Sequence, residues 1–232
     1  NTAGSITSSV SANTTAGFSI VSWTGNNTAG ATIGHGLSST PSMIIVKNRN
    51  AVTNWRVYHQ ALGNTGALAL QDTTAVATSI GYWNDTSPTS SLVTLGSSDQ
   101  ANGANPMVAY CFAEKKGYSK FGSYTGNKND NGVFVYTGFK PAWIMFKNTV
   151  RTDQNWVLQD NKINSYNGSY NFLVPNSSIA QASGSSVAID FLSNGFKMRG
   201  SDDATNDDVL MIYAAFAENP LVGSNNIPTT AR

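Results

Sequence analysis

Residues 41–48 read PSMIIVKN, and residues 141–148 read PAWIMFKN. Each stretch places an unbroken apolar run between a proline and a Lys-Asn pair, which is the pattern of a strand buried on both faces. The sequence TGN also occurs twice, at residues 24–26 and 125–127, and Asn54-Trp55 returns as Asn155-Trp156. Because these blocks keep their order at nearly constant spacing, the sequence predicts a tandem internal duplication.

The ends of the two copies are marked by a fourth repeated block, FAE, at residues 112–114 and 216–218. We therefore predict an N-terminal extended segment at residues 1–16, a first β-repeat at 17–117, a second β-repeat at 118–220 and a C-terminal arm at 221–232. Glu114 and Glu218 are the only glutamates and occupy the same repeat position. We expect them to cap a strand or to bond a neighbouring loop; a catalytic pair on a pseudo-twofold axis is the alternative.

Short apolar runs rich in β-branched and aromatic residues alternate with turns rich in Gly, Asn, Asp and Ser, and no segment sustains a 3.6-residue period. This predicts an all-β fold of antiparallel β-sandwich units, jelly-roll-like, with a pseudo-twofold relation between the copies. The strands expected in the first copy are 18–23, 43–48, 55–59, 67–71, 92–95 and 107–113. Those expected in the second copy are 119–124, 134–136, 143–147, 156–159, 196–199 and 209–216.

The composition excludes several classes of function. Charged residues make up 12% of the chain and the net charge is +1, so no basic surface for nucleic acid is expected. No apolar run approaches the roughly 20 residues of a membrane span, so membrane insertion is not expected. The single cysteine, Cys111, lies in an apolar run and should be a buried small side chain. Because the chain begins with Asn1, we expect further residues upstream.

Several blocks resemble a β-domain of structural proteins from tailed bacteriophages, especially marine ones. The resemblance extends from Gly17 to Pro220 and rests on motifs that include HGL (35–37), YCFAE (110–114), GYSKFGSYTGN (117–127), VYTGFKPAW (135–143), DFLSNGFK (190–197) and AFAENP (215–220). It implies a tail-fibre or tail-associated protein of the virion, an extracellular particle. Some proteins of this kind also carry domains similar to concanavalin-like lectins.

The resemblance implies a non-enzymatic module that recognises host-surface glycans. The expected partners are other virion proteins, a host glycan and further copies of the chain, with a trimer favoured for a fibre. One alternative is a capsid or collar decoration protein without a ligand, and another is a glycan depolymerase. The resemblance brings no catalytic motif and no cofactor with it.

The best sequence candidate for a sugar-binding loop is Tyr82-Trp83-Asn84-Asp85, because it has no counterpart in the second copy. Aromatic rings cover the apolar faces of sugars, and amide and carboxylate groups bond their hydroxyls. The alternative is a loop whose aromatic side chains close the end of the sandwich.

Four carboxylates, Asp202, Asp203, Asp207 and Asp208, lie within seven residues. Oxygen ligands of this kind suit Ca²⁺, although the spacing does not match an EF-hand loop. The alternative is a solvated acidic turn. The two histidines, His35 and His59, have no GxSxG nucleophile motif beside them, so no catalytic triad is expected.

Overall fold

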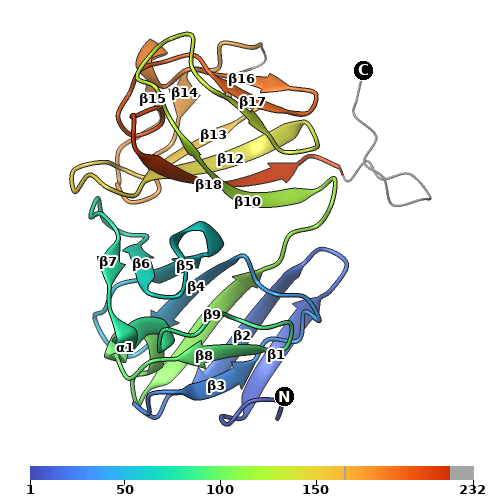
Figure 1. Ribbon diagram of the computed structural model, residues 1–232, viewed down its shortest axis with the longest axis vertical. Coiled ribbons are helices and arrows are strands. Elements are labelled where there is room, and N and C mark those ends of the chain that lie inside the picture. The colour runs from blue at the N-terminus through green and yellow to red at the C-terminus, as the bar shows by residue number, and fades with distance from the viewer. Residues whose placement is uncertain (165, 220–232) are drawn as a thin grey trace. The chain divides into compact units, whose positions relative to one another are not determined.

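Both repeated apolar stretches form central strands, as expected for segments buried on two faces. They are β4 (Met43–Asn48) and β12 (Pro141–Asn148), and each has a strand neighbour on either side. The computed structural model describes residues 1–164 and 166–219 (Figure 1).

The described residues divide into two units. Unit 1 contains Asn1–Leu70 and Val76–Glu114, and unit 2 contains Gln71–Ala75 and the described residues from Lys115 onward. The predicted boundary after residue 117 falls close to this division. Residues 1–16, expected to lie apart, belong to unit 1, and the predicted arm at 221–232 lies outside the described residues.

Unit 1 is built from a seven-stranded sheet, in the order β1-β2-β9-β4-β5-β6-β7, and a two-stranded ribbon, β3-β8. Its apolar core takes side chains from both, including Val21 and Ile44 of the sheet and Ile33 and Val93 of the ribbon. The remaining strands are β1 (Ser8–Asn13), β2 (Phe18–Thr24), β3 (Ala31–Gly34), β5 (Arg56–His59), β6 (Gly66–Ala69), β7 (Ala77–Thr78), β8 (Leu92–Leu95) and β9 (Pro106–Phe112). The helical turns are η1 (Gln60–Leu62), α1 (Ile80–Trp83) and α2 (Asp99–Asn102).

Unit 2 contains a four-stranded sheet, β10-β18-β12-β13, a three-stranded sheet, β11-β17-β16, and a short pair, β14-β15. Its core likewise combines side chains of the two larger sheets, such as Phe146 and Tyr213 with Val135 and Phe196. The strands are β10 (Ser119–Thr125), β11 (Phe134–Tyr136), β13 (Val157–Asp160), β14 (Asn171–Phe172), β15 (Ala182–Ser183), β16 (Ile189–Leu192), β17 (Gly195–Met198) and β18 (Leu210–Ala217), with one helical turn, η2 (Ser185–Val187).

The two units share a strand order and a register. The run β2-β9-β4-β5 of unit 1 corresponds to β10-β18-β12-β13 of unit 2. The residues of the repeated FAE block have matching partners: Phe112 lies opposite Phe18 and Met43, and Phe216 lies opposite Ser119 and Trp143. In the same way, the pair Ile33/Val93 of β3-β8 corresponds to Val135/Phe196 of β11-β17.

The predicted all-β class of antiparallel sheets is confirmed, with 41% of the described residues in strands and 6% in helices. The finer expectations, a jelly-roll-like sandwich and an origin by duplication with a pseudo-twofold relation, stay predictions, and the matching strand orders and registers support the duplication. Strands β1, β3, β7, β14, β15 and β16 were not expected. The Ser-, Ala- and Thr-rich sequences of β1 and β3 lack the apolar pattern on which strand prediction depends, whereas β16 is apolar and was missed. None of the described helices is long and apolar enough to cross a membrane.

A buried asparagine explains the repeated TGN sequence. In unit 1 the Asn102 side chain donates to Asn26 Oδ1 (2.9 Å) and accepts from Asn26 N (3.3 Å); in unit 2 Asn206 does the same with Asn127 (3.1 Å each). We call Asn102 and Asn206 the hub asparagines. Their side chains join the turn after the first strand of the common sheet to the turn before its last strand.

The glycine of TGN allows these two turns to meet. A Cβ atom on Gly25 would lie 1.9 Å from the Gly103 carbonyl oxygen, and one on Gly126 would lie 2.2 Å from the Asp207 carbonyl oxygen. No side chain can be placed at such distances, so both copies require glycine here.

Both histidines cap turns. His35 is fully buried; its Nδ1 accepts from Leu37 N (3.3 Å), and its Nε2 lies 3.2 Å from the Thr89 carbonyl oxygen. At the matching position of unit 2, the Thr137 hydroxyl accepts from Phe139 N (3.4 Å). His59 Nδ1 likewise accepts from Ala61 N (3.2 Å). Burial lowers the pKa of His35, because the charged imidazolium loses its hydration.

We predict that His35→Thr makes unit 1 less sensitive to acid. The folded chain holds His35 with a pKa below its unfolded value of about 6.5, so the stability due to the neutral ring is present above about pH 6.5 and is lost as the pH falls. The threonine keeps the turn cap and has no proton to gain. Chemical denaturation at about pH 7.5 and about pH 5.5 should show a smaller loss of unfolding free energy in the variant; an equal loss in both proteins would contradict this assignment.

Candidate functional site

The outer face of the sheet β11-β17-β16 carries two exposed aromatic rings. Along β11 the side chains alternate, so that Val135 is buried while Phe134 and Tyr136 are 47% and 59% exposed. Two rings on one face of one strand are separated by two residues, or about 7 Å. They form an apolar surface next to solvent.

The matching positions of unit 1 show that the fold does not require these rings. Since Ile33 corresponds to Val135, Phe134 corresponds to Thr32 and Tyr136 to Gly34. The same backbone arrangement is therefore satisfied by a small polar residue and by glycine. The rings are a property of unit 2 and not of the common scaffold.

Residues near the start of the chain cover the equivalent surface of unit 1. Ile6 N donates to the Thr32 carbonyl (3.0 Å), and Ser5 N donates to the Thr32 hydroxyl (2.9 Å). A Cβ atom on Gly34 would lie 2.5 Å from the Asn1 side chain, which occupies that space. In unit 2 the corresponding space is taken by Tyr136, whose ring stays open to solvent.

Each ring of β11 has a lysine beside it. The Lys120 ammonium lies 5.7 Å from the centre of the Tyr136 ring, a cation–π distance. Lys197 of β17 lies directly opposite Phe134 in the sheet, and its Nζ donates to the Gly132 carbonyl (2.7 Å). We call Phe134, Tyr136, Lys120 and Lys197 together the aromatic–lysine face.

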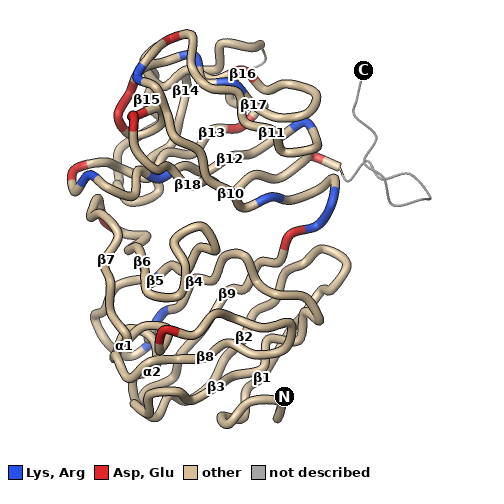
Figure 2. Tube along the Cα trace, viewed as in Figure 1, with Lys and Arg blue, Asp and Glu red and all other residues tan. Residues whose placement is uncertain are grey.

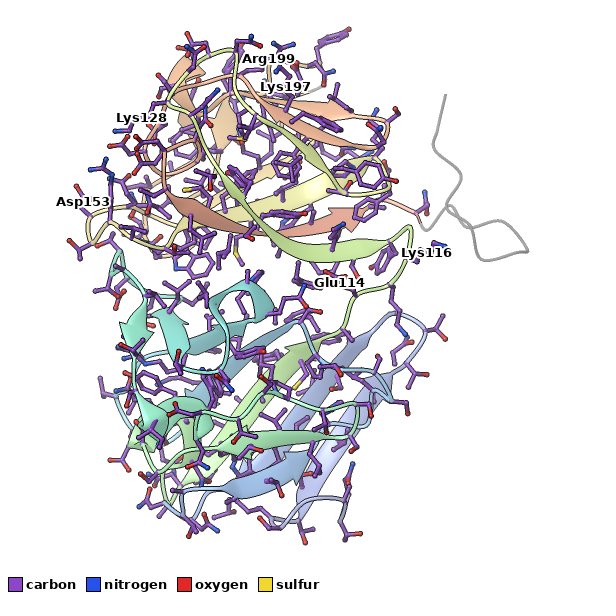
Figure 3. The ribbon with its side chains drawn as sticks, in the orientation of Figure 1. Glu114, Lys116, Lys128, Asp153, Lys197 and Arg199 are labelled. Atoms are coloured by element: carbon purple, nitrogen blue, oxygen red, sulfur yellow. The ribbon has the colours of Figure 1, made fainter. Side chains whose placement is uncertain are left out.

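An ion pair lies next to this face. Asp190 of β16 is opposite Lys197 in the sheet, and its Oδ2 accepts from Arg199 Nε (2.5 Å). Its other oxygen accepts from Gly168 N (2.9 Å), so the carboxylate is held by groups of the protein itself. Most charged residues of the chain lie in unit 2 (Figure 2), and Figure 3 labels Lys197 and Arg199 close together in that unit.

The loop predicted to bind sugar, Tyr82 to Asp85, does not present its rings to solvent. Trp83 is 1% exposed, packs edge-on against Tyr58 and donates from Nε1 to the Gly66 carbonyl (3.0 Å). Tyr82 is also buried, and the guanidinium carbon of Arg56 lies 4.6 Å from the centre of the Tyr82 ring. Asn84 and Asp85 shape the following turn with φ of 51° and 47°. The binding prediction is wrong for both aromatic side chains, which close the core as the alternative proposed.

We predict that Trp83→Ala destabilises the protein by about 3–5 kcal/mol, because it leaves a cavity in the core of unit 1 and an unpaired Gly66 carbonyl. Equilibrium denaturation measures this loss. An unchanged unfolding free energy combined with lost glycan binding would restore the original interpretation of the loop.

The acidic run from Asp202 to Asp208 is a network of ion pairs. The Asp207 side chain is fully buried and pairs with Arg151 and with Lys128 Nζ (3.3 Å), and it accepts from Asn148 Nδ2 (3.0 Å). Asp203 also contacts Lys128 (2.9 Å). Arg151 is the main reason that the pKa of Asp207 lies far below its usual value.

The calcium prediction is wrong for this arrangement. Within residues 1–164 and 166–219, no group of three or more His, Cys, Asp or Glu side chains is placed to hold a metal ion. Two cationic side chains already neutralise Asp203 and Asp207, while Asp202 accepts from Ser186 Oγ (3.2 Å) and from Ala204 N (2.9 Å). Asp208 is exposed. The other expectation, a solvated turn, is wrong for the buried Asp207.

We predict that Asp207→Asn lowers the unfolding free energy at neutral pH by roughly 2–4 kcal/mol, since it leaves Arg151 and Lys128 without their buried partner. The folded pKa of Asp207 is depressed, so its contribution is present above about pH 4 and is lost on further acidification. The variant should therefore lose less stability in acid than the parent. If the unfolding free energies of the parent and of Asp207→Asn fall equally as the pH is lowered, the role of this carboxylate is contradicted.

The two glutamates bond neighbouring loops, which is one of the structural roles expected for them. Glu114 Oε1 accepts from Gln60 Nε2 (3.0 Å), and Glu218 Oε1 accepts from Lys162 Nζ (2.8 Å). Cys111 is buried, as predicted, and burial raises the pKa of its thiol to about 12.

A shallow groove of about 490 Å³ lies in unit 1 at the ends of β1, β2 and β9. Hydroxyl side chains such as Ser9 and Ser22 line it together with Arg49. Its aromatic residue, Trp23, is only 5% exposed, so the groove offers no open ring. The aromatic–lysine face is therefore the better candidate for binding.

The signal for this face was present in the sequence. Residues 134–136 were expected to form a strand, and alternation along a strand places Phe134 and Tyr136 on one side. Alignment of residues 32–34 with 134–136 would then have shown that both rings are specific to the second copy.

The family described as Domain of unknown function (DUF7483) matches residues 1–220. The chain belongs to this family. Because the match extends over both units, the DUF7483 family model describes two repeated units together and not a single repeat. Comparisons with curated proteins and with solved structures find no match.

Proposed function

We propose that this DUF7483 chain is a non-enzymatic virion protein, of the tail-fibre or tail-associated kind, which binds host-surface glycans through the aromatic–lysine face. The observation that carries the binding role is the pair of exposed rings at positions where unit 1 has Thr32 and Gly34. An exposed apolar surface is costly to keep in water, and one that the fold does not need indicates a ligand. The virion location rests on the sequence resemblance alone.

The chemistry of the face suits carbohydrate. Aromatic rings pack on the C–H faces of sugars, and ammonium groups bond hydroxyl or acidic oxygens. Hydrolysis of a glycan would need two free carboxylates across the bound chain. The carboxylate beside this face, Asp190, is occupied by Arg199 and Gly168. This supports recognition over depolymerisation.

Assembly would strengthen the binding. A fibre with several copies of the chain, a trimer in the simplest case, presents one such face for each copy. Several weak sites on one particle raise the effective affinity for a polymeric surface without any new contact.

We predict that Phe134→Ala and Tyr136→Ala each weaken glycan binding by roughly 2- to 10-fold, because each removes one stacking ring. A glycan array and intact host cells measure the effect. Ile80→Ala and Val150→Ala remove exposed apolar side chains elsewhere and should leave binding unchanged.

Two outcomes would contradict the proposal. Failure of the folded parent to bind any glycan or any host cell would favour the decoration protein without a ligand. Release of reducing ends from host polysaccharide, abolished by Asp190→Asn, would identify a depolymerase.

A further inference from the structure

The aromatic–lysine face combines its groups in two pairs. Lys120 lies over the Tyr136 ring, and Lys197 lies across the sheet from Phe134. The two rings follow one another along β11, so each is accompanied by an ammonium group of its own. A ligand that follows the strand would meet an apolar surface and a cation twice in succession.

The face has an excess of positive charge. The outward positions of the sheet, namely 134 and 136 of β11, 195 and 197 of β17, and 190 and 192 of β16, include one carboxylate, that of Asp190. Arg199 neutralises it at 2.5 Å. Lys197 and Lys120 therefore remain to interact with a ligand, and Lys197 uses one of its three donors on Gly132.

All four groups of the face differ from their counterparts in unit 1. Phe134 and Tyr136 correspond to Thr32 and Gly34. By the same registers, Lys197 corresponds to Thr94 and Lys120 to Ser19. Rings and cations are thus present together in unit 2 and missing together in unit 1. Ser19 and Gly34 are buried in unit 1, so the four groups reach solvent together only in unit 2, as expected of one binding site.

We propose that this face binds acidic polysaccharides, whose sugars carry carboxylate groups, with one sugar face on each ring and one carboxylate on each lysine. The inference rests on the proposed function and names its class of ligand. A neutral glycan would use the rings but would leave both ammonium groups without an opposite charge. Surface ion pairs are screened by salt, so the preference for acidic chains weakens as ionic strength rises.

The test compares polymers that share a backbone and differ in charge. Polygalacturonate, alginate and hyaluronate are each paired with a methyl-esterified or carboxyl-reduced form, and binding of the full chain is measured by biolayer interferometry at low and high salt. The parent should prefer each acidic form that it binds. Lys120→Met and Lys197→Met should each reduce that preference by roughly two- to fivefold and leave binding of the neutral form nearly unchanged.

Matched controls separate a local effect from the loss of a general charge. Lys116→Met removes another exposed lysine of unit 2 (Figure 3) and should keep the preference. Lys120→Arg and Lys197→Arg should retain it as well. Thermal unfolding establishes that each variant is folded.

The possible failures are distinguishable. Equal binding of acidic and neutral forms, or binding of neutral glycans only, overturns the acidic class but leaves the proposed function intact. A preference for acidic chains that survives when Lys120→Met and Lys197→Met are combined in one chain overturns the role of the two lysines. If no acidic chain binds, this inference fails; if the glycan array is also silent, the proposed function fails with it.

Discussion

The hydrogen bonds of the hub asparagines hold each unit together at one end of its main sheet. A primary amide has donors and acceptors side by side, and when buried it must satisfy all of them. Asn102 and Asn206 do so with the TGN asparagine and with backbone carbonyls of nearby turns. These bonds fix where the first strand ends and where the last begins, and the register between the two strands follows from that.

Comparison of the two units separates the features of the common scaffold from those that are specific to one unit. Both units have four strands in the same order and register, together with matching turn caps and hub asparagines, so these features belong to the scaffold. Differences at matching positions then identify what each unit adds. In unit 2 these are the ion pairs around Asp207, where unit 1 has Gly103, and the aromatic–lysine face. The first is buried and contributes to stability, whereas the rings of the second are exposed at positions where unit 1 has Thr32 and Gly34.

Most of the scaffold could be predicted from the sequence, because its apolar strands are repeated and flanked by clear turn signals. Polar strands such as β1 could not, since their pairing depends on a neighbour and not on their own pattern. Trp83 was misassigned because its loop has no counterpart, yet uniqueness in sequence does not reveal burial. Asp207 was misassigned because Arg151 and Lys128 are distant in sequence and meet it only in the fold. The two rings of the aromatic–lysine face could have been predicted from the sequence, because side chains alternate along β11 and place Phe134 and Tyr136 on the same side.

The covered ribbon of unit 1 shows what an open face like that of unit 2 requires besides its side chains. Its backbone pairing matches that of β11 and β17, but rings and lysines at Thr32, Gly34, Thr94 and Ser19 would not by themselves produce the same open face, because Ser19 is fully buried. In addition, the Asn1 side chain occupies the space that an aromatic ring at position 34 would need. The early residues of the chain thus cover in unit 1 the strand positions that unit 2 leaves open to solvent.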